Sequence, residues 1–519
     1  MKKKVISVLM ASAMSLSLLA GCGSTTPAAT ESNDSTATET PAADSNSDSD
    51  SAAAPAASGD VTEISVYRCT FNLANPDSAQ VQKVQDAINA YIADKIPVQI
   101  KLTDIGSGEY TDKANLALAN NEINLLWTAS WEGTIGTNDL YPANAVYDLT
   151  DLVPGTPLYS SMAEGQWEAA KYDGKIYFVP VYKDNVEGYD FMFRQDLVDQ
   201  HNWDLNSVKE LKDLEPMLAD AKADGLKYPF LTQKTAMFYR WYIDKFDFFT
   251  ADSATNFFAV DRAKDEVVDT IQTPEYLEFC KLIADWADKG YISEDDFTKV
   301  TTDTTTQTQD WAISWWTDIP VNDEADARYG QDVTMVPATQ RWAHSTSALG
   351  SCYCVTANST PEQAKACVDF LGLLYTDSTL ADMYTFGIEG EDFTYDANHQ
   401  VTQTSDKYNH SMWESANATI VTPLDNEPAN KAELYNDFNG GANTSSAAGF
   451  RFDKSPVEAQ YTACAGVFDT YGFALENGGV APADVESTLE KYQAALDEAG
   501  YQDVLAEFQK QYNDWKASK

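Results

Sequence analysis

Aromatic side chains are the groups in this sequence best suited to binding a ligand. The chain has 12 tryptophans and 27 tyrosines. Their rings can stack on the apolar C–H faces of a pyranose while its hydroxyls take polar partners. Because a single tryptophan more often belongs to a core, we assign Trp286 and Trp515, which lie in helical patterns, to the core. The candidates on predicted loops are Tyr67, Trp127, Trp131, Tyr182, Trp241, Trp315, Trp316, Trp342 and Trp413.

One tryptophan pair stands out by its spacing. Trp315 and Trp316 are adjacent and are followed by Thr317, Asp318 and Pro320. Neighbouring strand residues point to opposite faces, so these side chains cannot all point into a core. At least one of the two tryptophans is expected to face a ligand cleft.

Polar partners for hydroxyl groups are expected on the same loops. Carboxylates and amides suit this role because they accept or donate two hydrogen bonds side by side. For Glu132 and Asp318 a solvated loop charge is an equally good interpretation. The polar candidates are Asn72, Glu132, Asp184, Asn185 and Asp318.

Arginines offer a different chemistry. Arg68, Arg240 and Arg341 could clamp a carboxylate if the ligand were a uronic-acid oligosaccharide, and of these we keep Arg68 as a site candidate. An arginine more often packs its stem on the surface, which is the alternative for all three.

Other functional classes find little support. With 80 Asp and Glu residues, a pair of catalytic carboxylates could be selected anywhere by chance, so we expect no catalytic residues. The net charge of −45 and the absence of a Lys/Arg run in the folded part argue against nucleic acid. Besides Cys22 there are six cysteines, without a paired metal motif, so we expect buried thiols, with disulfides as the alternative, and no metal or cofactor.

The N-terminus carries a targeting signal. Lys2, Lys3 and Lys4 precede an apolar run, Val5 to Leu19, that is too short to span a membrane stably. The run ends in Leu-Ala-Gly-Cys at positions 19–22, which resembles the bacterial lipobox. The resemblance implies a signal peptide over 1–21 and a lipid-anchored Cys22 as the first mature residue; an ordinary secretion signal with a chance cysteine is the alternative.

Residues 22–60 form a tether. They contain almost only small, polar and acidic residues, which cannot bury enough apolar surface to offset the entropy lost on ordering. We therefore expect this segment to be disordered.

The folded part opens with alternating strands and helices. "EISVYRCTF" (63–71), "PVQIKLTDI" (97–105) and "INLLWTASW" (123–131) read as strands, and helical patterns separate them. This order predicts an α/β layer with a mainly parallel sheet. Ligands on such sheets gather at the carboxyl ends of the strands, here residues 68–72 and 128–133.

Two central motifs carry a family resemblance. "DGKIYFVP" (173–180) leads to a break and then to "EGYDFMFRQDL" (187–197). This stretch resembles family 1 of the bacterial extracellular solute-binding proteins, the receptors of sugar-importing ABC transporters. In that family the break is the point where the chain crosses from one lobe to the other. "DVTMVPA" (332–338) resembles the return crossing, and "TFGIEGEDFTY", "GFRFDKSPVEAQ" and the closing helices resemble the LipO-type lipoprotein branch.

The resemblance implies a two-lobed, periplasmic-binding-protein-like α/β fold with a ligand cleft between the lobes. Lobe 1 is expected over 61–184 and 336–396, and lobe 2 over 185–335 and 397–519, including the C-terminal helices. The boundaries between 397 and 440 rest on only a loose match.

The implied function is a monomeric receptor on the extracellular face of the cell membrane. It would capture an oligosaccharide and deliver it to the permease subunits of an ABC importer. Two alternatives stay open: a receptor of the same fold for peptides or another small solute, and a secreted glycoside hydrolase.

The lipobox generates the first prediction. Cys22→Ala should release the protein from membranes and leave its ligand affinity unchanged, because the tether separates the anchor from the fold. Membrane fractionation and calorimetry check this, and a variant that stays with the membrane would show that another feature holds it.

Overall fold

The computed structural model describes residues 61–233, 235–249, 257–294, 308–321, 331–343 and 347–519. The expected signal peptide (1–21) and tether (22–60), with Cys22, lie outside the described residues. Among the described residues, no helix has the length and apolar character needed to cross a membrane.

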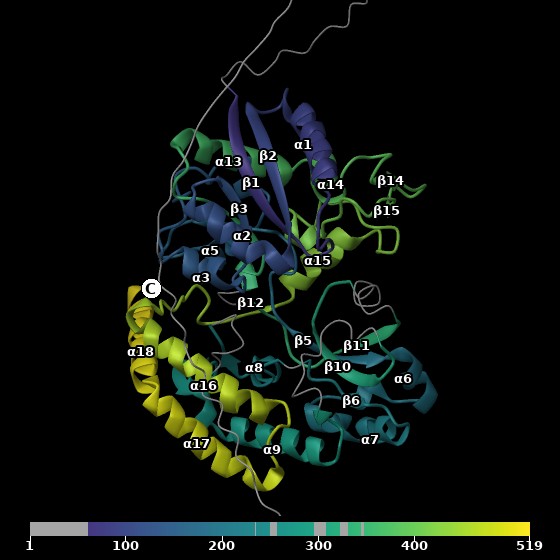
Figure 1. Cartoon of the computed structure of the whole chain (residues 1–519), viewed down its shortest axis with the longest axis vertical. Coiled ribbons are helices and arrows are strands. Elements are labelled where there is room, and N and C mark those ends of the chain that lie inside the picture. Colours follow the sequence, from purple (N-terminus) through teal and green to yellow (C-terminus); the bar gives the residue numbers. More distant parts are fainter. Residues whose placement is uncertain (1–60, 234, 250–256, 295–307, 322–330, 344–346) are drawn as a thin grey trace, which may run out of the picture. The chain divides into compact units, whose positions relative to one another are not determined.

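Lobe 1 is built on a five-stranded sheet in the order β2-β1-β3-β13-β4. The first three strands pair in parallel, as the strand–helix alternation predicts, and β13 is antiparallel to β3 and β4. Helices α1, α2, α13 and α14 lie around this sheet (Figure 1). The strands are β1 (Thr62–Thr70), β2 (Val98–Gly106), β3 (Leu125–Thr128), β4 (Phe178–Pro180) and β13 (Cys352–Val355); the helices are α1 (Ser78–Ile92), α2 (Ser107–Ala119), α3 (Thr137–Leu140), α4 (Pro157–Ser160), α5 (Glu164–Ala170), α13 (Pro361–Leu374) and α14 (Ser378–Phe386).

Local sequence explains where the main helices of lobe 1 begin. Asp77 caps α1 by accepting from the backbone N–H groups of Ala79 and Gln80. Thr360 and Gln363 form a reciprocal capping box on α13, with Pro361 in its first turn. Each helix then buries one apolar stripe against the sheet.

Lobe 2 has its own sheet and its own core. Four strands pair in the order β11-β5-β10-β6, with β5 antiparallel to both of its neighbours. A smaller sheet, β7-β8-β9, lies in the same lobe. The elements are β5 (Tyr189–Arg194), β6 (Tyr228–Phe230), β7 (Phe246–Asp247), β8 (Phe258–Asp261), β9 (Glu266–Asp269), β10 (Trp311–Thr317), β11 (Val333–Pro337), α6 (Gln195–His201), α7 (Glu215–Ala223), α8 (Phe238–Tyr242) and α9 (Pro274–Asp288).

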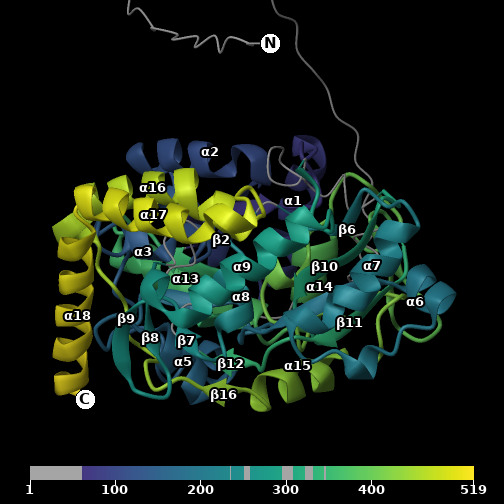
Figure 2. The same ribbon diagram turned by 90° about the horizontal axis from the view of Figure 1, so that it is seen from below.

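Three long helices complete lobe 2. They are α16 (Glu458–Glu476), α17 (Val485–Glu498) and α18 (Tyr501–Ser518). Figure 2 shows α16 beside α17, and α16 also packs on α9. Their apolar faces join the same core as β5, α8 and α9. With one core in each lobe, the expected two-lobed α/β fold is confirmed.

Counted between the described elements, the chain passes from one lobe to the other at three places. The first crossing (181–188) joins β4 to β5, the second joins β12 (Trp342–Ala343) to β13, and the third joins α15 (Lys431–Gly440) to β16 (Asn443–Thr444). Backbone hydrogen bonds connect them: Glu187 pairs with Trp342 at 2.9 and 2.8 Å, and β12 pairs in parallel with β16. We call these paired segments the hinge.

Two expected boundaries differ in the structure. The segment predicted as the return crossing, 332–338, forms the edge strand β11 of lobe 2, because its backbone completes the ladder with β5. The second difference concerns 397–440, which was expected in lobe 2. Tyr408 and Ala416 join the core of lobe 1, and Val401, Met412 and Tyr435 pack on α14. This segment contains β15 (Val401–Gln403) and α15, and β14 (Phe393–Tyr395) precedes it.

The six cysteines within the described residues are buried and free, in agreement with the expected buried thiols. Burial raises the pKa of Cys464 to about 11, so this thiol is protonated at neutral pH.

A buried carboxyl at the start of β5 generates a prediction about stability. Asp190 is 3% exposed, and its Oδ1 has no hydrogen-bond partner. Burial, and then the nearby Asp318, raise the pKa of Asp190 to about 8, while Arg341 opposes the rise. A raised folded-state pKa stabilises the protonated protein fully below about pH 4 and loses that contribution as the pH rises through about 8.

Asp190→Asn should therefore make the free energy of unfolding less dependent on pH in the range up to about pH 8. We expect the free energy of unfolding of the wild type to fall relative to the variant by roughly 1–3 kcal/mol between pH 6 and 8.5. Urea unfolding at both pH values measures this, with Asp437→Asn, on an exposed side chain of α15, as the control. An equal pH dependence in the wild type and both variants would contradict the buried-carboxyl interpretation.

Candidate ligand-binding site

A cavity of about 1000 Å³ is lined by both lobes and by the first crossing. Lobe 1 contributes the loops after β1 and β3, which are the carboxyl ends predicted from the sequence, and also residues 403–435. Lobe 2 contributes α8, β7 and the end of β10.

An aromatic cluster forms the lobe 1 wall. Phe71 follows β1, Trp131 follows β3, and Trp413 comes from a short helical turn, 412–414. The three rings lie 5.0–6.4 Å apart and rest on the buried Trp127. Phe71 and Trp131 are 38% and 41% exposed, which is unusual for large apolar side chains. We call Phe71, Trp131 and Trp413 the aromatic platform.

Hydrogen bonds fix the platform. The indole N–H of Trp131 donates to the backbone oxygen of Gly350 at 2.7 Å, and that of Trp127 donates to Ser351 Oγ at 2.9 Å. Asn72 Nδ2 donates to Asn409 Oδ1 and to Ser411 Oγ at 3.0 and 3.1 Å. The loop after β1 is thereby joined to the segment that carries Trp413.

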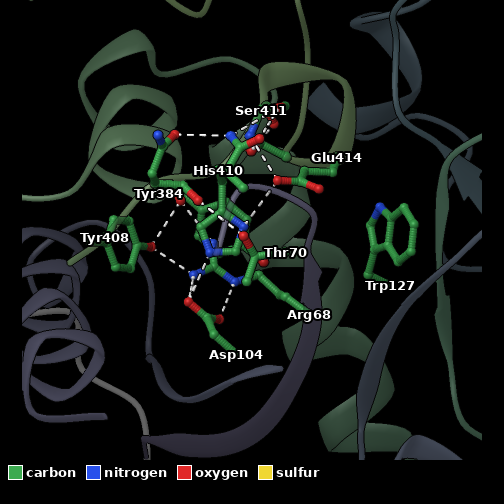
Figure 3. Close-up of polar contacts among 12 residues, drawn as sticks. Arg68, Thr70, Asp104, Trp127, Tyr384, Tyr408, His410, Ser411 and Glu414 are labelled. Carbon is green, nitrogen blue, oxygen red and sulfur yellow. Dashed lines mark hydrogen bonds and ion pairs between the residues drawn. The ribbon is translucent and has the colours of Figure 1, made fainter. Parts of the chain in front are cut away.

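A buried ionic network holds the segment 408–414 in place (Figure 3). Arg68 donates to both oxygens of Asp104 at 2.8 Å, and His410 Nε2 lies 2.8 Å from Asp104 Oδ2. Glu414 accepts from the backbone N–H of Ser411 at 2.7 Å. Because these side chains are about 2% exposed or less, the network fixes the position of the turn that carries Trp413.

The charges of this network are balanced. Burial alone would raise the pKa of Asp104, but Arg68 and His410 hold it below its ordinary value. Burial and Arg68 lower the pKa of His410, but Asp104 and Glu414 outweigh them and raise it. The ion pair therefore keeps His410 positively charged more readily than a free histidine.

Aromatic and cationic side chains form the lobe 2 wall. Trp316 lines the cavity, whereas Trp315 is buried and its indole N–H donates to the backbone oxygen of Thr232 at 3.1 Å. Tyr239 and Arg240 come from α8, and the guanidinium of Arg240 lies 4.0 Å from the ring centroid of Trp315.

The ammonium groups and guanidinium groups of three other lining residues are paired with carboxylates. Lys183 Nζ lies 2.8 Å from Asp184 Oδ1, and Arg262 lies 2.7 Å from Asp247 Oδ1. Lys431 donates to both oxygens of Glu427 at 2.6 Å in a pair that is almost fully buried.

The structure brings part of the predicted site together. Asn72, Trp131, Asp184 and Trp316 line the cavity, as do Trp413 and Arg240. Of the two adjacent tryptophans, Trp316 lines the cavity and Trp315 is buried. A role in ligand binding stays a prediction for each of these residues.

The other predicted site residues do not line the cavity. Arg68 and Asp318 are buried in ion pairs, with Asp104 and Arg341, so neither Arg68 nor Arg341 is placed to clamp a ligand carboxylate. Trp127 and Trp315 are buried, Tyr67 packs on the lobe 1 core, and Trp241 stacks on Phe191 at 4.9 Å. Glu132, Tyr182, Asn185 and Trp342 bond instead to Thr111, Asn436, Gln166 and Asp244.

Several residues that line the cavity were not among the site residues predicted from the sequence. Phe71 ends the first strand motif. It could have been predicted, because ligands on parallel sheets gather at the carboxyl ends of the strands. Tyr239 and Phe248 lie in an aromatic-rich stretch without a clear period. Leu424, Glu427, Lys431 and Tyr435 come from the segment where the sequence patterns are weakest.

Comparisons with known proteins agree with this architecture. A carbohydrate ABC transporter substrate-binding protein of Streptococcus pneumoniae serotype 4 (strain ATCC BAA-334 / TIGR4) is 24% identical, over 89% of this chain and 92% of the relative. The N-glycan transport solute binding protein (NgtS) of S. pneumoniae has a similar crystal structure, with a TM-score of 0.75, 22% identity, and 88% and 100% of the two chains covered.

Another solved structure shares the fold. The HMO-binding, ABC-transporter-associated solute-binding protein of Bifidobacterium longum infantis matches with a TM-score of 0.61 and 15% identity, over 88% of this chain and 99% of that chain.

Family comparison covers most of the folded chain. Residues 446–517, which include α16–α18, match a domain of unknown function (DUF3502). Residues 86–390, more than half of the chain, match the family described as bacterial extracellular solute-binding protein. The predicted family is therefore confirmed: this chain belongs to the bacterial extracellular solute-binding proteins.

Proposed function

We propose that this protein captures a neutral oligosaccharide outside the cell membrane and delivers it to an ABC importer. Extracellular solute-binding proteins of ABC importers act outside the membrane, and they bind substrates rather than convert them. The observation that carries the proposal is a cavity lined by aromatic rings from both lobes: the aromatic platform on lobe 1, and Tyr239 and Trp316 on lobe 2.

Cavity size supports an oligosaccharide rather than a single sugar. The volume of about 1000 Å³ lies at the upper end of the range for small-molecule sites, about 300–1000 Å³. Two further crystal structures of NgtS are complexes with Man1GlcNAc and Man5GlcNAc, and they match this chain with TM-scores of 0.69 and 0.66. These glycans are therefore suitable first probes.

Charge pairing supports a neutral ligand. An anionic glycan would need a cation that is not already neutralised. Of the cations on the described lining, Lys183, Arg262 and Lys431 each pair with a carboxylate, whereas Arg240 packs on the rings of Tyr239 and Trp315. Exchanging such a partner for a ligand carboxylate would leave a buried charge unpaired. Neutral hydroxyl groups can instead bond to the same groups without breaking the pairs.

The mechanism follows from the hinge. A ligand shifts a protein toward the closed form only through contacts that the closed form strengthens, and these must come from both lobes. A glycan held between Trp131 on lobe 1 and Trp316 on lobe 2 meets this condition. The hinge limits the relative motion because its three crossings are hydrogen-bonded to one another.

A lipid on Cys22 would hold this receptor at the membrane. Two acyl chains are enough for stable anchoring, and a disordered tether over 22–60 would let the monomeric lobes reach the permease subunits. The lipobox supports this part of the proposal.

Ligand binding is the direct test of the proposal. Calorimetry with Man1GlcNAc, Man5GlcNAc and a panel of neutral oligosaccharides should detect at least one ligand with micromolar or tighter affinity, about −8 kcal/mol or better. Matched acidic glycans should bind more weakly, because three of the lining cations, Lys183, Arg262 and Lys431, are already paired with carboxylates. Binding to peptides alone would overturn the sugar assignment and favour a receptor for another solute.

The platform gives a second, residue-level prediction. Trp131→Ala should weaken the binding of the best panel glycan by roughly 1–3 kcal/mol, by analogy with stacked bases on aromatic side chains. The matched control is Trp203→Ala, a partly exposed tryptophan that stacks on His201 away from the cavity. Equal affinities for both variants and the wild type would show that Trp131 is not part of the site.

A further inference from the structure

The C-terminal helices pack directly behind the lobe 2 wall of the cavity. The segment 238–248 supplies Tyr239, Arg240 and Phe248 to the lining. Immediately after it, Phe249 packs on Phe450 and on Phe508 of α18, with ring centroids 5.2 and 5.6 Å apart. The region matched to the domain of unknown function is therefore continuous with the core that backs the site.

One polar side chain from this region reaches the start of α8. Glu476, the last residue of α16, is 1% exposed. Its Oε2 accepts from the backbone N–H groups of Met237 and Phe238 at 2.7 and 3.0 Å, and its Oε1 accepts from Tyr276 Oη at 3.0 Å. The next residue, Asn477, donates from Nδ2 to the backbone oxygen of Thr235 at 3.0 Å.

These hydrogen bonds fix the backbone just before two residues of the cavity lining, Tyr239 and Arg240. Tyr239 and Arg240 follow Phe238 directly, and the Arg240 guanidinium donates to the backbone oxygen of Ala236. The same guanidinium lies 4.5 Å from the ring centroid of Tyr239. A shift of the backbone at 236–238 would therefore move the cation and the ring on the cavity lining together.

A carboxylate is a costly choice at this position. Burial raises the pKa of Glu476 to about 7, although its hydrogen bonds with Phe238, Met237 and Tyr276 oppose the rise. An apolar residue would avoid this desolvation but would leave the two N–H groups without their acceptor. The hydrogen bonds that Glu476 accepts from the N–H groups of Met237 and Phe238 therefore explain why a carboxylate stands at this position.

We infer that Glu476 is a positioning residue of the ligand site, and that the C-terminal domain of unknown function serves as the structural support of the lobe 2 wall. Glu476 would set Tyr239 and Arg240 toward the ligand by fixing the backbone of residues 237 and 238. The ligand-binding part of this inference rests on the proposed function, whereas the backbone part does not.

Four full-length variants test the inference. Glu476→Ala removes every acceptor, and Glu476→Asp shortens the side chain so that it no longer reaches both N–H groups. Glu476→Gln keeps one oxygen for the N–H groups and an amide that can donate to Tyr276 Oη. Asp469→Asn changes an exposed carboxylate of the same helix and serves as the control.

Amide hydrogen exchange is the readout that needs no ligand. Exchange at Met237 and Phe238 should accelerate in Glu476→Ala and Glu476→Asp, and should stay near the wild-type rate in Glu476→Gln and Asp469→Asn. Unchanged exchange at these two amides in Glu476→Asp would overturn the inference. The Asp and Gln variants decide the question even if the Ala variant does not fold.

Affinity for Man5GlcNAc then separates positioning from general stability. At a temperature where all variants are folded, Glu476→Asp should bind this glycan about tenfold more weakly, and Glu476→Gln should bind within about threefold of the wild type. Accelerated exchange with unchanged affinity would overturn the positioning role. If the wild type binds no glycan of the panel, the proposed function fails. The exchange rates still test whether Glu476 fixes the backbone of residues 237 and 238.

Discussion

Two backbone hydrogen bonds between Glu187 and Trp342 hold the first and second crossings together, and the binding site depends on this pairing. The third crossing joins them through the parallel pair β12–β16. A single flexible linker would leave the two aromatic walls free to take many relative positions. Three paired crossings instead restrict the motion of the walls, so that a ligand touching both can select one closed arrangement.

Each wall is supported from behind by buried polar groups. On lobe 1 the network of Arg68, Asp104 and His410 fixes the turn that carries Trp413. On lobe 2 Glu476 holds the start of α8. Removing one member of such a network leaves a buried charge or donor unpaired, which costs more than the pair itself contributes. Rigid walls bind at a lower entropic cost than walls that must first be ordered.

The sequence predicted the fold better than the site. Strand and helix periods are local, so the parallel strands β1–β3 could be recognised, and the motifs of the family resemblance located the first crossing. The third crossing could not be located, because residues 397–440 lack a clear period and their packing on α14 is a tertiary contact. Whether a tryptophan is exposed is also decided by tertiary packing: Trp127 and Trp131 share one strand motif, yet only Trp131 faces the cavity. The ion pair of Arg68 could not be predicted either. Its network joins Asp104, Tyr408 and His410, which are distant in the sequence, and the last two lie where the sequence patterns are weak.

A crystal structure of the chain with Man5GlcNAc bound tests the central claim most directly. We predict that sugar rings lie on Trp131 or Trp413 of the aromatic platform and also contact Trp316 or Tyr239 on lobe 2. A glycan that contacts only one lobe, or that binds outside the cavity, would contradict the proposal that the ligand draws the two lobes together.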